Sequence, residues 1–338
     1  MSTSTNMDRL NSYLINFPRT QLANTPTPLE KMPRLSENIN GPVYFVKRDD
    51  LTGFAGGGNK ARQLEYSFGD AIKNGATMIL ITGAVQSNYV RSAAAAAAKL
   101  GLACHVQLEN RVGGMPGIYH SSGNVLLNKI FGAEMILCPT NKNVEEFAKE
   151  IMEDRKRQGA NPYFIPVGGS NHLGELGYIE CMREIIEQDS EKLFTHIILA
   201  TGSGGTHAGL IAGKAHYKSD IEIIGISIKD KKLDQEEKVF RLAKNSCDFI
   251  QCKSLDRKNV IVEDAYVGEG YAIPTEGMKK ALKLMARKEA ILLDPVYSGK
   301  AFDGLIDLVK KGHFKDSDKI LFIHTGGSAA IPAYEWAF

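Results

Sequence analysis

A glycine-rich turn at residues 202–206 follows directly on the apolar run 197–200. An uninterrupted apolar run predicts a buried parallel strand, and the small residues from His207 onward predict a helix. A turn of this kind directs several backbone N–H groups and the positive end of a helix dipole at one point. With the hydroxyls of Ser203 and Thr206 as further donors, it can bind a phosphate. The alternative is a tight strand-to-helix turn without a ligand.

The spacing of these glycines differs from that of the common nucleotide-binding motifs. His207 stands where the dinucleotide fingerprint G-x-G-x-x-G requires its third glycine. No Lys-Ser or Lys-Thr pair follows, so the turn is not a nucleotide P-loop either. No such fingerprint with an acidic residue beyond it follows an early strand, which argues against a dinucleotide-dependent oxidoreductase.

Lys60 follows a run of three glycines, 56–58, and Asn59, and it begins a predicted helix over 60–74. The dipole at a helix start disfavours an ammonium and favours the neutral amine. A neutral lysine amine is a nucleophile that forms a Schiff base with a carbonyl group. An exposed lysine at a helix start is the alternative. We favour the nucleophile, because flexibility around Lys60 is the only evident use of these glycines in the sequence.

A polar triplet, Gln86, Ser87 and Asn88, follows a predicted strand that ends at Thr82 and begins a predicted helix over 88–100. Side-chain amides, a hydroxyl and free N–H groups at a helix start can bind a carboxylate. The alternative is an ordinary helix N-cap made by Ser87 or Asn88, which needs no ligand.

Strand patterns alternate with helical patterns along the chain, which predicts an α/β fold with mostly parallel, doubly wound sheets in two lobes and a ligand between them. We expect a large domain from residues 1–54 and 166–338 and a small domain from residues 55–165. The predicted strands span 43–47, 77–82, 105–109, 134–138, 163–167, 196–200, 222–228 and 320–324. The predicted helices span 60–74, 88–100, 144–158, 174–188 and 275–288.

The composition is that of a cytoplasmic metabolic enzyme. The 338 residues carry a formal net charge of +2 with 24% charged residues, so neither a nucleic-acid nor a membrane partner is expected. The mixed-charge block 229–232 is interpreted as a solvated face. Five scattered cysteines predict reduced thiols rather than a disulfide framework or a metal site. No apolar segment has the length of a signal or a membrane span. We expect a homodimer that binds a small amino-acid substrate.

Eight collinear segments resemble the fold-type-II pyridoxal 5′-phosphate enzymes, whose fold is that of the tryptophan synthase β chain. The resemblance is specifically to the branch of D-cysteine desulfhydrase and 1-aminocyclopropane-1-carboxylate (ACC) deaminase, and it covers nearly the whole chain. The segments are TPTPLEKMPRLS (25–36), VKRDD to GGNK (46–60), AVQSN (84–88), AAKLGL (97–102), IPVGGSN (165–171), GSGGTHAGL (202–210), LLDPVYSGKA (292–301) and LFIHTGGSAA (321–330).

The resemblance implies a role for each group described above. Lys60 would bind pyridoxal phosphate through a Schiff base, Asn88 would contact the ring hydroxyl, and Thr325 would lie near the pyridine nitrogen. Ser87 and Gln86 would contact the substrate carboxylate or take part in proton transfer. The phosphate would be bound by Thr201, Gly202, Ser203, Gly204, Gly205 and Thr206.

Two tyrosines, Tyr271 and Tyr297, match the pair that lines the pocket in this family. Near the cofactor and Lys60, the pKa of a phenol can fall enough for acid–base catalysis. We expect Tyr297 to carry the proton and Tyr271 to shape the pocket. The alternative is that both only pack on the ring or bind the carboxylate.

Two departures from the family pattern bear on the substrate. The deaminase branch has Glu directly after the second tyrosine, where it contacts the pyridine nitrogen, and this chain has Ser298. A hydroxyl there leaves the ring a weaker electron sink, which suits loss of a good leaving group better than cyclopropane opening. Tyr89 replaces a histidine of the desulfhydrase motif, which alters the wall of the substrate pocket.

These features predict a lyase that eliminates the Cβ substituent of a small amino acid. D-cysteine would give pyruvate, ammonia and sulfide. L-cysteate, with sulfite as the leaving group, is the alternative; it is disfavoured because the matched loops show no additional cation. ACC deamination is a weaker alternative. A protein that binds the cofactor without turnover is a rival, against which the intact Lys60, Tyr271, Tyr297 and Thr325 argue.

Overall fold

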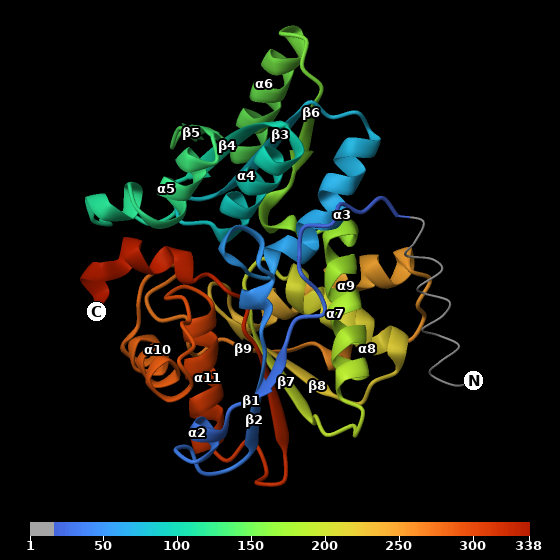
Figure 1. Ribbon diagram of the computed structural model, residues 1–338, viewed down its shortest axis with the longest axis vertical. Coiled ribbons are helices and arrows are strands. Elements are labelled where there is room, and N and C mark those ends of the chain that lie inside the picture. Colours follow the sequence, from blue (N-terminus) through green and yellow to red (C-terminus); the bar gives the residue numbers. More distant parts are fainter. Residues whose placement is uncertain (1–16) are drawn as a thin grey trace.

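The computed structural model describes residues 17–338, which contain two β-sheets flanked by helices (Figure 1). The larger sheet has the order β1-β2-β10-β7-β8-β9, and only β1 is antiparallel to its neighbour. The smaller sheet has the order β5-β4-β3-β6 and is parallel throughout. The strands of the larger sheet are Leu29–Lys31, Val43–Lys47, His196–Thr201, Glu222–Ser227, Ile261–Glu263 and Lys319–Ile323, for β1, β2 and β7 to β10. Those of the smaller sheet are Met78–Ala84, Ala103–Glu109, Glu134–Leu137 and Pro162–Ile165, for β3 to β6.

The larger sheet is covered on both faces because successive side chains of a strand point to opposite sides. In β7, Ile197 and Leu199 belong to one apolar core, and Ile198 and Ala200 belong to another. The first core is closed by α7 (His172–Gln188), α8 (Gly205–Tyr217) and α9 (Lys232–Phe249). The second is closed by α2 (Pro33–Ser36), α10 (Glu276–Glu289) and α11 (Ser298–Lys310). Burial on both faces explains why the parallel strands are continuous apolar runs.

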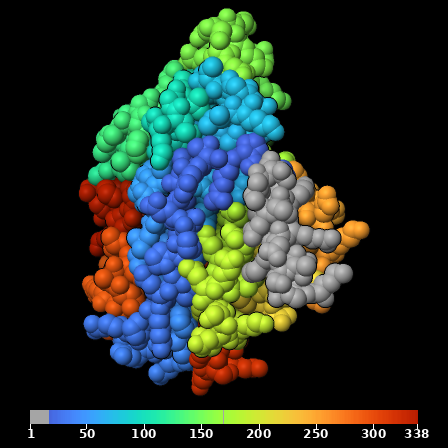
Figure 2. Space-filling model, turned by 45° about the vertical axis from the view of Figure 1, so that its right-hand side comes forward, coloured from blue at the N-terminus to red at the C-terminus, as the bar shows by residue number. Residues whose placement is uncertain are grey.

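The smaller sheet follows the same rule. In β3, Ile79 and Ile81 pack with α3 (Lys60–Lys73) and α4 (Asn88–Leu100), whereas Met78 and Leu80 pack with α6 (Val144–Arg157). The remaining helix, α5 (Gly123–Ile130), lies beside the C-terminal 3₁₀ segment Ser328–Ala337. In Figure 2 the smaller sheet and its helices form a narrower lobe on top of a wider one.

The predicted α/β fold class is confirmed, and every predicted strand and helix corresponds to an observed element; 43–47 and 88–100 match at both ends, and the others have shifted ends. The three-residue strands β1 and β9 and the helices α2, α5, α9 and α11 were not predicted from the sequence. All strands of the smaller sheet lie within residues 55–165, and the division into domains stays a prediction. Within residues 17–338, no helix is long and apolar enough to cross a membrane. No cluster of three or more His, Cys, Asp or Glu in that range could hold a metal ion.

Candidate active site

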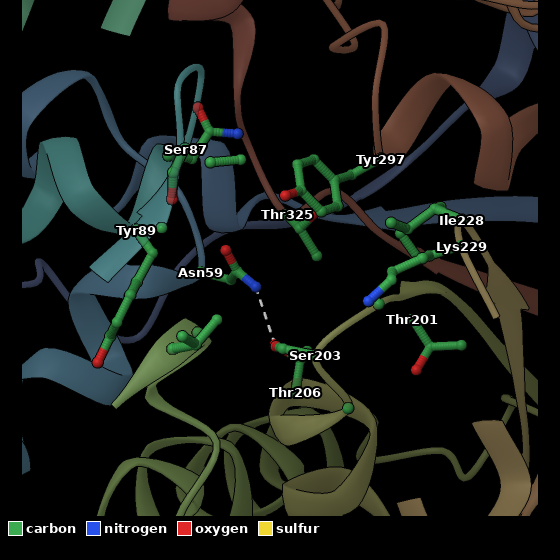
Figure 3. A pocket seen from close by; sticks show the side chains of 18 of the residues that line it. Asn59, Ser87, Tyr89, Thr201, Ser203, Thr206, Ile228, Lys229, Tyr297 and Thr325 are labelled. Atoms are coloured by element: carbon green, nitrogen blue, oxygen red, sulfur yellow. Dashed lines mark hydrogen bonds between the residues drawn. The ribbon is translucent and has the colours of Figure 1, made fainter. Parts of the chain in front are cut away.

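A cavity of about 280 Å³ opens where strands of the two sheets end. Its walls include the carboxyl ends of β3 and β7 and the turn that follows β10, which is where ligands bind in parallel α/β sheets. Figure 3 shows side chains from both lobes around this space. Of the predicted site residues, the lining includes Lys60, Ser87, Asn88, Tyr89, Thr201, Gly202, Ser203, Gly204, Thr206, Tyr271, Tyr297 and Thr325. It does not include Gln86, Gly205 or Ser298.

Lys60 is the first residue of α3, and its side chain reaches the cavity. The Nζ atom donates hydrogen bonds to Gln63 Oε1 at 2.9 Å and to the Gly168 carbonyl at 3.3 Å. It lies 5.4 Å from the centroid of the Tyr89 ring. Burial lowers the pKa of Lys60 to about 8. Desolvation, rather than the expected helix dipole, is the cause of this shift, and the consequence is the same: an amine that is readily neutral.

The glycines before Lys60 serve close packing, which corrects our interpretation of them as a source of flexibility. Gly57 has φ 74°, and a Cβ on it would lie 1.7 Å from the Asp50 carbonyl oxygen. Gly58 has φ 120° and packs against Gly326, where an added Cβ would be 2.6 Å from the Gly58 Cα. The Asn59 N–H also donates to the Thr325 carbonyl at 3.1 Å. The backbone before the lysine is therefore held firmly against the turn that follows β10.

The turn 202–206 has the geometry of an anion site. Gly204 is the N-cap of α8 with φ 94°, and the helix begins at Gly205, earlier than the expected His207. The first N–H groups of a helix have no partner within it and are free to donate to a ligand. Asn59 Nδ2 donates to Thr206 Oγ1 at 2.8 Å across the cavity (Figure 3). The donor set matches a phosphate group.

At the start of α4, Ser87 caps the helix by accepting from the Val90 N–H at 3.3 Å, as one interpretation of the sequence expected. It also lines the cavity, and its contact with a substrate carboxylate stays a prediction. Asn88 lines the cavity, and its Oδ1 accepts from Asn124 Nδ2 at 2.9 Å.

Gln86 does not contact the cavity, contrary to the expected contact with substrate. Its Nε2 donates to the carbonyls of Tyr119 at 2.6 Å and Ser122 at 3.0 Å. Its Oε1 accepts from the Asn124 N–H at 2.9 Å. Gln86 thus holds the segment before α5 in place, and its amide has no free group to offer a substrate.

Tyr271 and Tyr297 contact each other in the wall of the cavity. Their hydroxyl oxygens are 2.6 Å apart, and the ring centroids are 6.1 Å apart in an edge-to-face arrangement. Burial raises the pKa of Tyr271 and of Tyr297. Without ligands the pKa of neither phenol is lowered, and a lowering by the bound cofactor stays a prediction. At neutral pH both phenols keep their protons and act as hydrogen-bond donors.

Ser298 is the first residue of α11, and its buried hydroxyl is hydrogen-bonded to both the carboxylate and the backbone of Asp294. Its Oγ donates to Asp294 Oδ1 at 2.7 Å and accepts from the Asp294 N–H at 2.8 Å. Asp294 also accepts from the N–H groups of Val296 and Tyr297. Ser298 therefore stabilises the turn that carries Tyr297. Contrary to the expected contact with the cofactor, Ser298 does not line the cavity.

Besides Lys60, three basic side chains line the cavity, which corrects the expectation of no additional cation. Arg111 follows β4, binds Glu109 and carries its charge close to both tyrosines. Lys229 follows β8 at the exposed edge, and Lys238 of α9 donates to the Gly202 carbonyl at 3.4 Å. The position of Arg111 just after a parallel strand was the available signal, because such positions converge on the ligand site.

Two lobes of parallel sheet around a lysine-containing cavity define the pyridoxal-phosphate enzymes of fold type II. A model of the family described as "Pyridoxal-phosphate dependent enzyme" matches residues 20–326, and the chain belongs to this family.

Three similar proteins illustrate the relationship. The D-cysteine desulfhydrase of Klebsiella pneumoniae (strain 342) is 44% identical over 322 residues, covering 95% of this chain and 97% of the relative. That of Salmonella typhi is 42% identical over 323 residues, covering 95% and 98%. A crystal structure described as an ACC deaminase homologue matches with a TM-score of 0.87 at 37% identity, covering 97% of this chain and 98% of the other.

Proposed function

We propose that this chain is a pyridoxal-phosphate dependent lyase that converts D-cysteine into pyruvate, ammonia and sulfide. The observation that carries the proposal is the meeting of the Lys60 amine, the turn 202–206 and the Tyr271–Tyr297 pair in one cavity. The similarity over 95% of the chain to a relative named D-cysteine desulfhydrase supports the choice of substrate.

The residues present fit the cofactor. The amine of Lys60 would bind its aldehyde carbon, and the turn 202–206 would bind its phosphate. Asn88 and Thr325 line the space between these two anchors. Pyridoxal phosphate supplies an electron sink that stabilises negative charge at the substrate α-carbon.

The side chains divide the proton transfers between them. Lys60, with its pKa lowered to about 8 by burial, accepts the proton from the α-carbon. The tyrosine pair, protonated at neutral pH, donates to the departing sulfur. Ser87 and Asn88 bind the substrate carboxylate at the start of α4, where free N–H groups favour an anion.

One feature of the cavity favours elimination over the ACC deaminase reaction. The residues that line it include no Asp or Glu, and the neutral Thr325 is the candidate neighbour of the pyridine nitrogen. A bound cofactor would have no carboxylate beside this nitrogen to hold it protonated and would be a weaker electron sink. Such a site suits a good leaving group such as sulfide.

A second candidate substrate is L-cysteate. Arg111 lines the cavity beside both tyrosines, and a guanidinium is well suited to bind a sulfonate. The structure thus removes our sequence argument against this substrate, and the alternative stays open.

Pyruvate release from a panel of D-cysteine, L-cysteine, L-cysteate, D-serine and ACC tests both candidates, with sulfide and sulfite measured alongside. We expect the highest kcat/KM and stoichiometric sulfide with D-cysteine. A preference for L-cysteate with sulfite release would establish the alternative, and pyruvate from none of them would refute β-elimination. Lys60→Ala protein is the blank.

We also propose that the chain works in the cytoplasm as a homodimer. Exposed apolar side chains on α5 and the C-terminal segment support a contact there, with Leu126, Ile130 and Trp336 exposed by 46%, 67% and 45%. Light scattering of the purified protein gives the oligomeric mass directly. A monomer at micromolar concentration would contradict the proposal.

A further inference from the structure

The C-terminal end of α9 brings two cysteines together in a specific backbone motif. The Cys252 N–H donates to the Cys247 carbonyl at 2.7 Å, and the Gln251 N–H donates to the Asp248 carbonyl at 3.2 Å. Gln251 has φ 57°, in the left-handed region. This pattern is a Schellman motif, in which the side chains of the first and last residues contact each other. Here both residues are cysteines, and the structure records them as free thiols in contact.

The two thiols have different surroundings. Cys247 is 2% exposed and belongs to the apolar core under α8 and α9. Cys252 is partly exposed on the turn after the helix, and His216 from the last turn of α8 interacts with it. The hydrogen bond from Cys247 and the neighbouring His216 lower the pKa of the Cys252 thiol. For Cys247, the same hydrogen bond to Cys252 raises the pKa of the thiol. These directions, together with the greater exposure of Cys252, favour the thiolate at this outer sulfur and the protonated thiol at the inner sulfur of Cys247.

We propose that Cys252 is a modification site for low-molecular-weight disulfides, with Cys247 as the resolving thiol. The thiolate of Cys252 attacks one sulfur of the disulfide R–S–S–R, whose S–S bond breaks and releases one thiolate, which takes a proton from water. The Cys247 thiol then loses its proton, and its sulfur attacks Cys252, releasing the second R–SH. One disulfide is reduced to two thiols, and Cys247 and Cys252 are oxidised to one disulfide.

The other cysteines provide an internal comparison. Burial raises the pKa of Cys104 to about 12, so this partly exposed thiol is a poor nucleophile. Cys138 and Cys181 are buried. Neither Cys247 nor Cys252 lines the cavity, so the reaction at this pair is separable from catalysis.

Glutathione disulfide is the probe, applied to the full-length protein loaded with its cofactor, and peptide mass spectrometry is the readout. The wild type should form an internal disulfide between Cys247 and Cys252, with loss of the two thiol hydrogens. Cys247→Ser should instead accumulate glutathione on Cys252, because nothing resolves the mixed disulfide. Cys252→Ser should lower the rate of thiol loss at least about tenfold. Cys104→Ser is the matched control and should react like the wild type.

His216→Asn tests whether the neighbouring imidazole activates the Cys252 thiol. In the Cys247→Ser background this substitution should slow glutathione addition to Cys252 several-fold. Glutathione on Cys104 before Cys252 would overturn the proposal, as would a Cys247→Ser protein without an adduct on Cys252. Circular dichroism confirms that each variant is folded, and Cys252→Ala replaces Cys252→Ser if the serine variant is not.

Discussion

The hydroxyl oxygens of Tyr271 and Tyr297 lie 2.6 Å apart, although the two residues come from the loop before α10 and the turn before α11. One hydroxyl donates its proton to the hydrogen bond between them, so the proton of the other hydroxyl remains available to donate to a ligand. Asp294 fixes the Tyr297 end of the pair by accepting its backbone N–H at 3.0 Å. The pair is therefore a rigid proton donor on the cavity wall.

Replacing the two tyrosines separately should distinguish their roles. Tyr297→Phe should retain the cofactor and bind substrate, yet lose about 100-fold or more in kcat, because proton donation to the leaving group is lost. Tyr271→Phe should mainly raise KM. Absorbance of the bound cofactor and steady-state kinetics provide the measurement. A near wild-type kcat for Tyr297→Phe would contradict this role of Tyr297 and make Lys60 or Ser87 the group that transfers the proton.

Lys60 should control cofactor binding with a characteristic pH dependence. Burial lowers its pKa to about 8, so the neutral, nucleophilic amine gains population as the pH rises through that value. The rate at which cofactor-free protein binds pyridoxal phosphate should rise with pH and level off above about pH 8, whereas an ordinary lysine would show a rise up to about pH 10.4. Stopped-flow absorbance measures this rate.

The holoenzyme should be yellow, and borohydride should bleach it and fix the label on Lys60. Lys60→Ala should abolish turnover, and Lys73→Ala, at the other end of the same helix, is the control that should bind cofactor normally. A label on another lysine would exclude this site.

Ser298→Glu should destabilise the protein, because it adds a carboxylate to a position where Ser298 is fully buried beside Asp294. An unpaired buried charge of this kind costs about 3–5 kcal/mol. Ser298→Ala should cost about 1–3 kcal/mol through the lost hydrogen bond. Urea unfolding gives both values. A stable Ser298→Glu protein with an altered cofactor spectrum would show that this position faces the ring after all.

Arg111→Gln should raise KM for the amino-acid substrate about tenfold with a smaller change in kcat, because a charge-assisted hydrogen bond contributes about 1.5–3 kcal/mol. The effect should be larger for L-cysteate than for D-cysteine if Arg111 binds the Cβ substituent. Arg257→Gln removes a guanidinium that stacks on Phe240 away from the cavity and is the matched control. Unchanged KM values for both substrates would show that Arg111 does not bind the substrate.

Much of the fold was predictable because its signals are local. Parallel strands buried on both faces are continuous apolar runs, and caps such as Thr275, which accepts from the Met278 N–H, mark where helices begin. The three-residue strands β1 and β9 were missed because so short a segment has no periodicity to recognise.

The family and the α/β architecture were predictable from the sequence, because collinear motifs and continuous apolar runs are visible in the chain itself. The candidate anion-binding turn and Lys60 were also found there, since each is marked by residues adjacent in the chain. Only the tertiary structure places Arg111 in the lining of the cavity. It also places Gln86 and Ser298 outside the lining, hydrogen-bonded to Tyr119 and to Asp294. It also decided that the phenols of Tyr271 and Tyr297 keep their protons. Burial and hydrogen-bond partners set these properties, and both arise from segments that come together only when the two sheets pack.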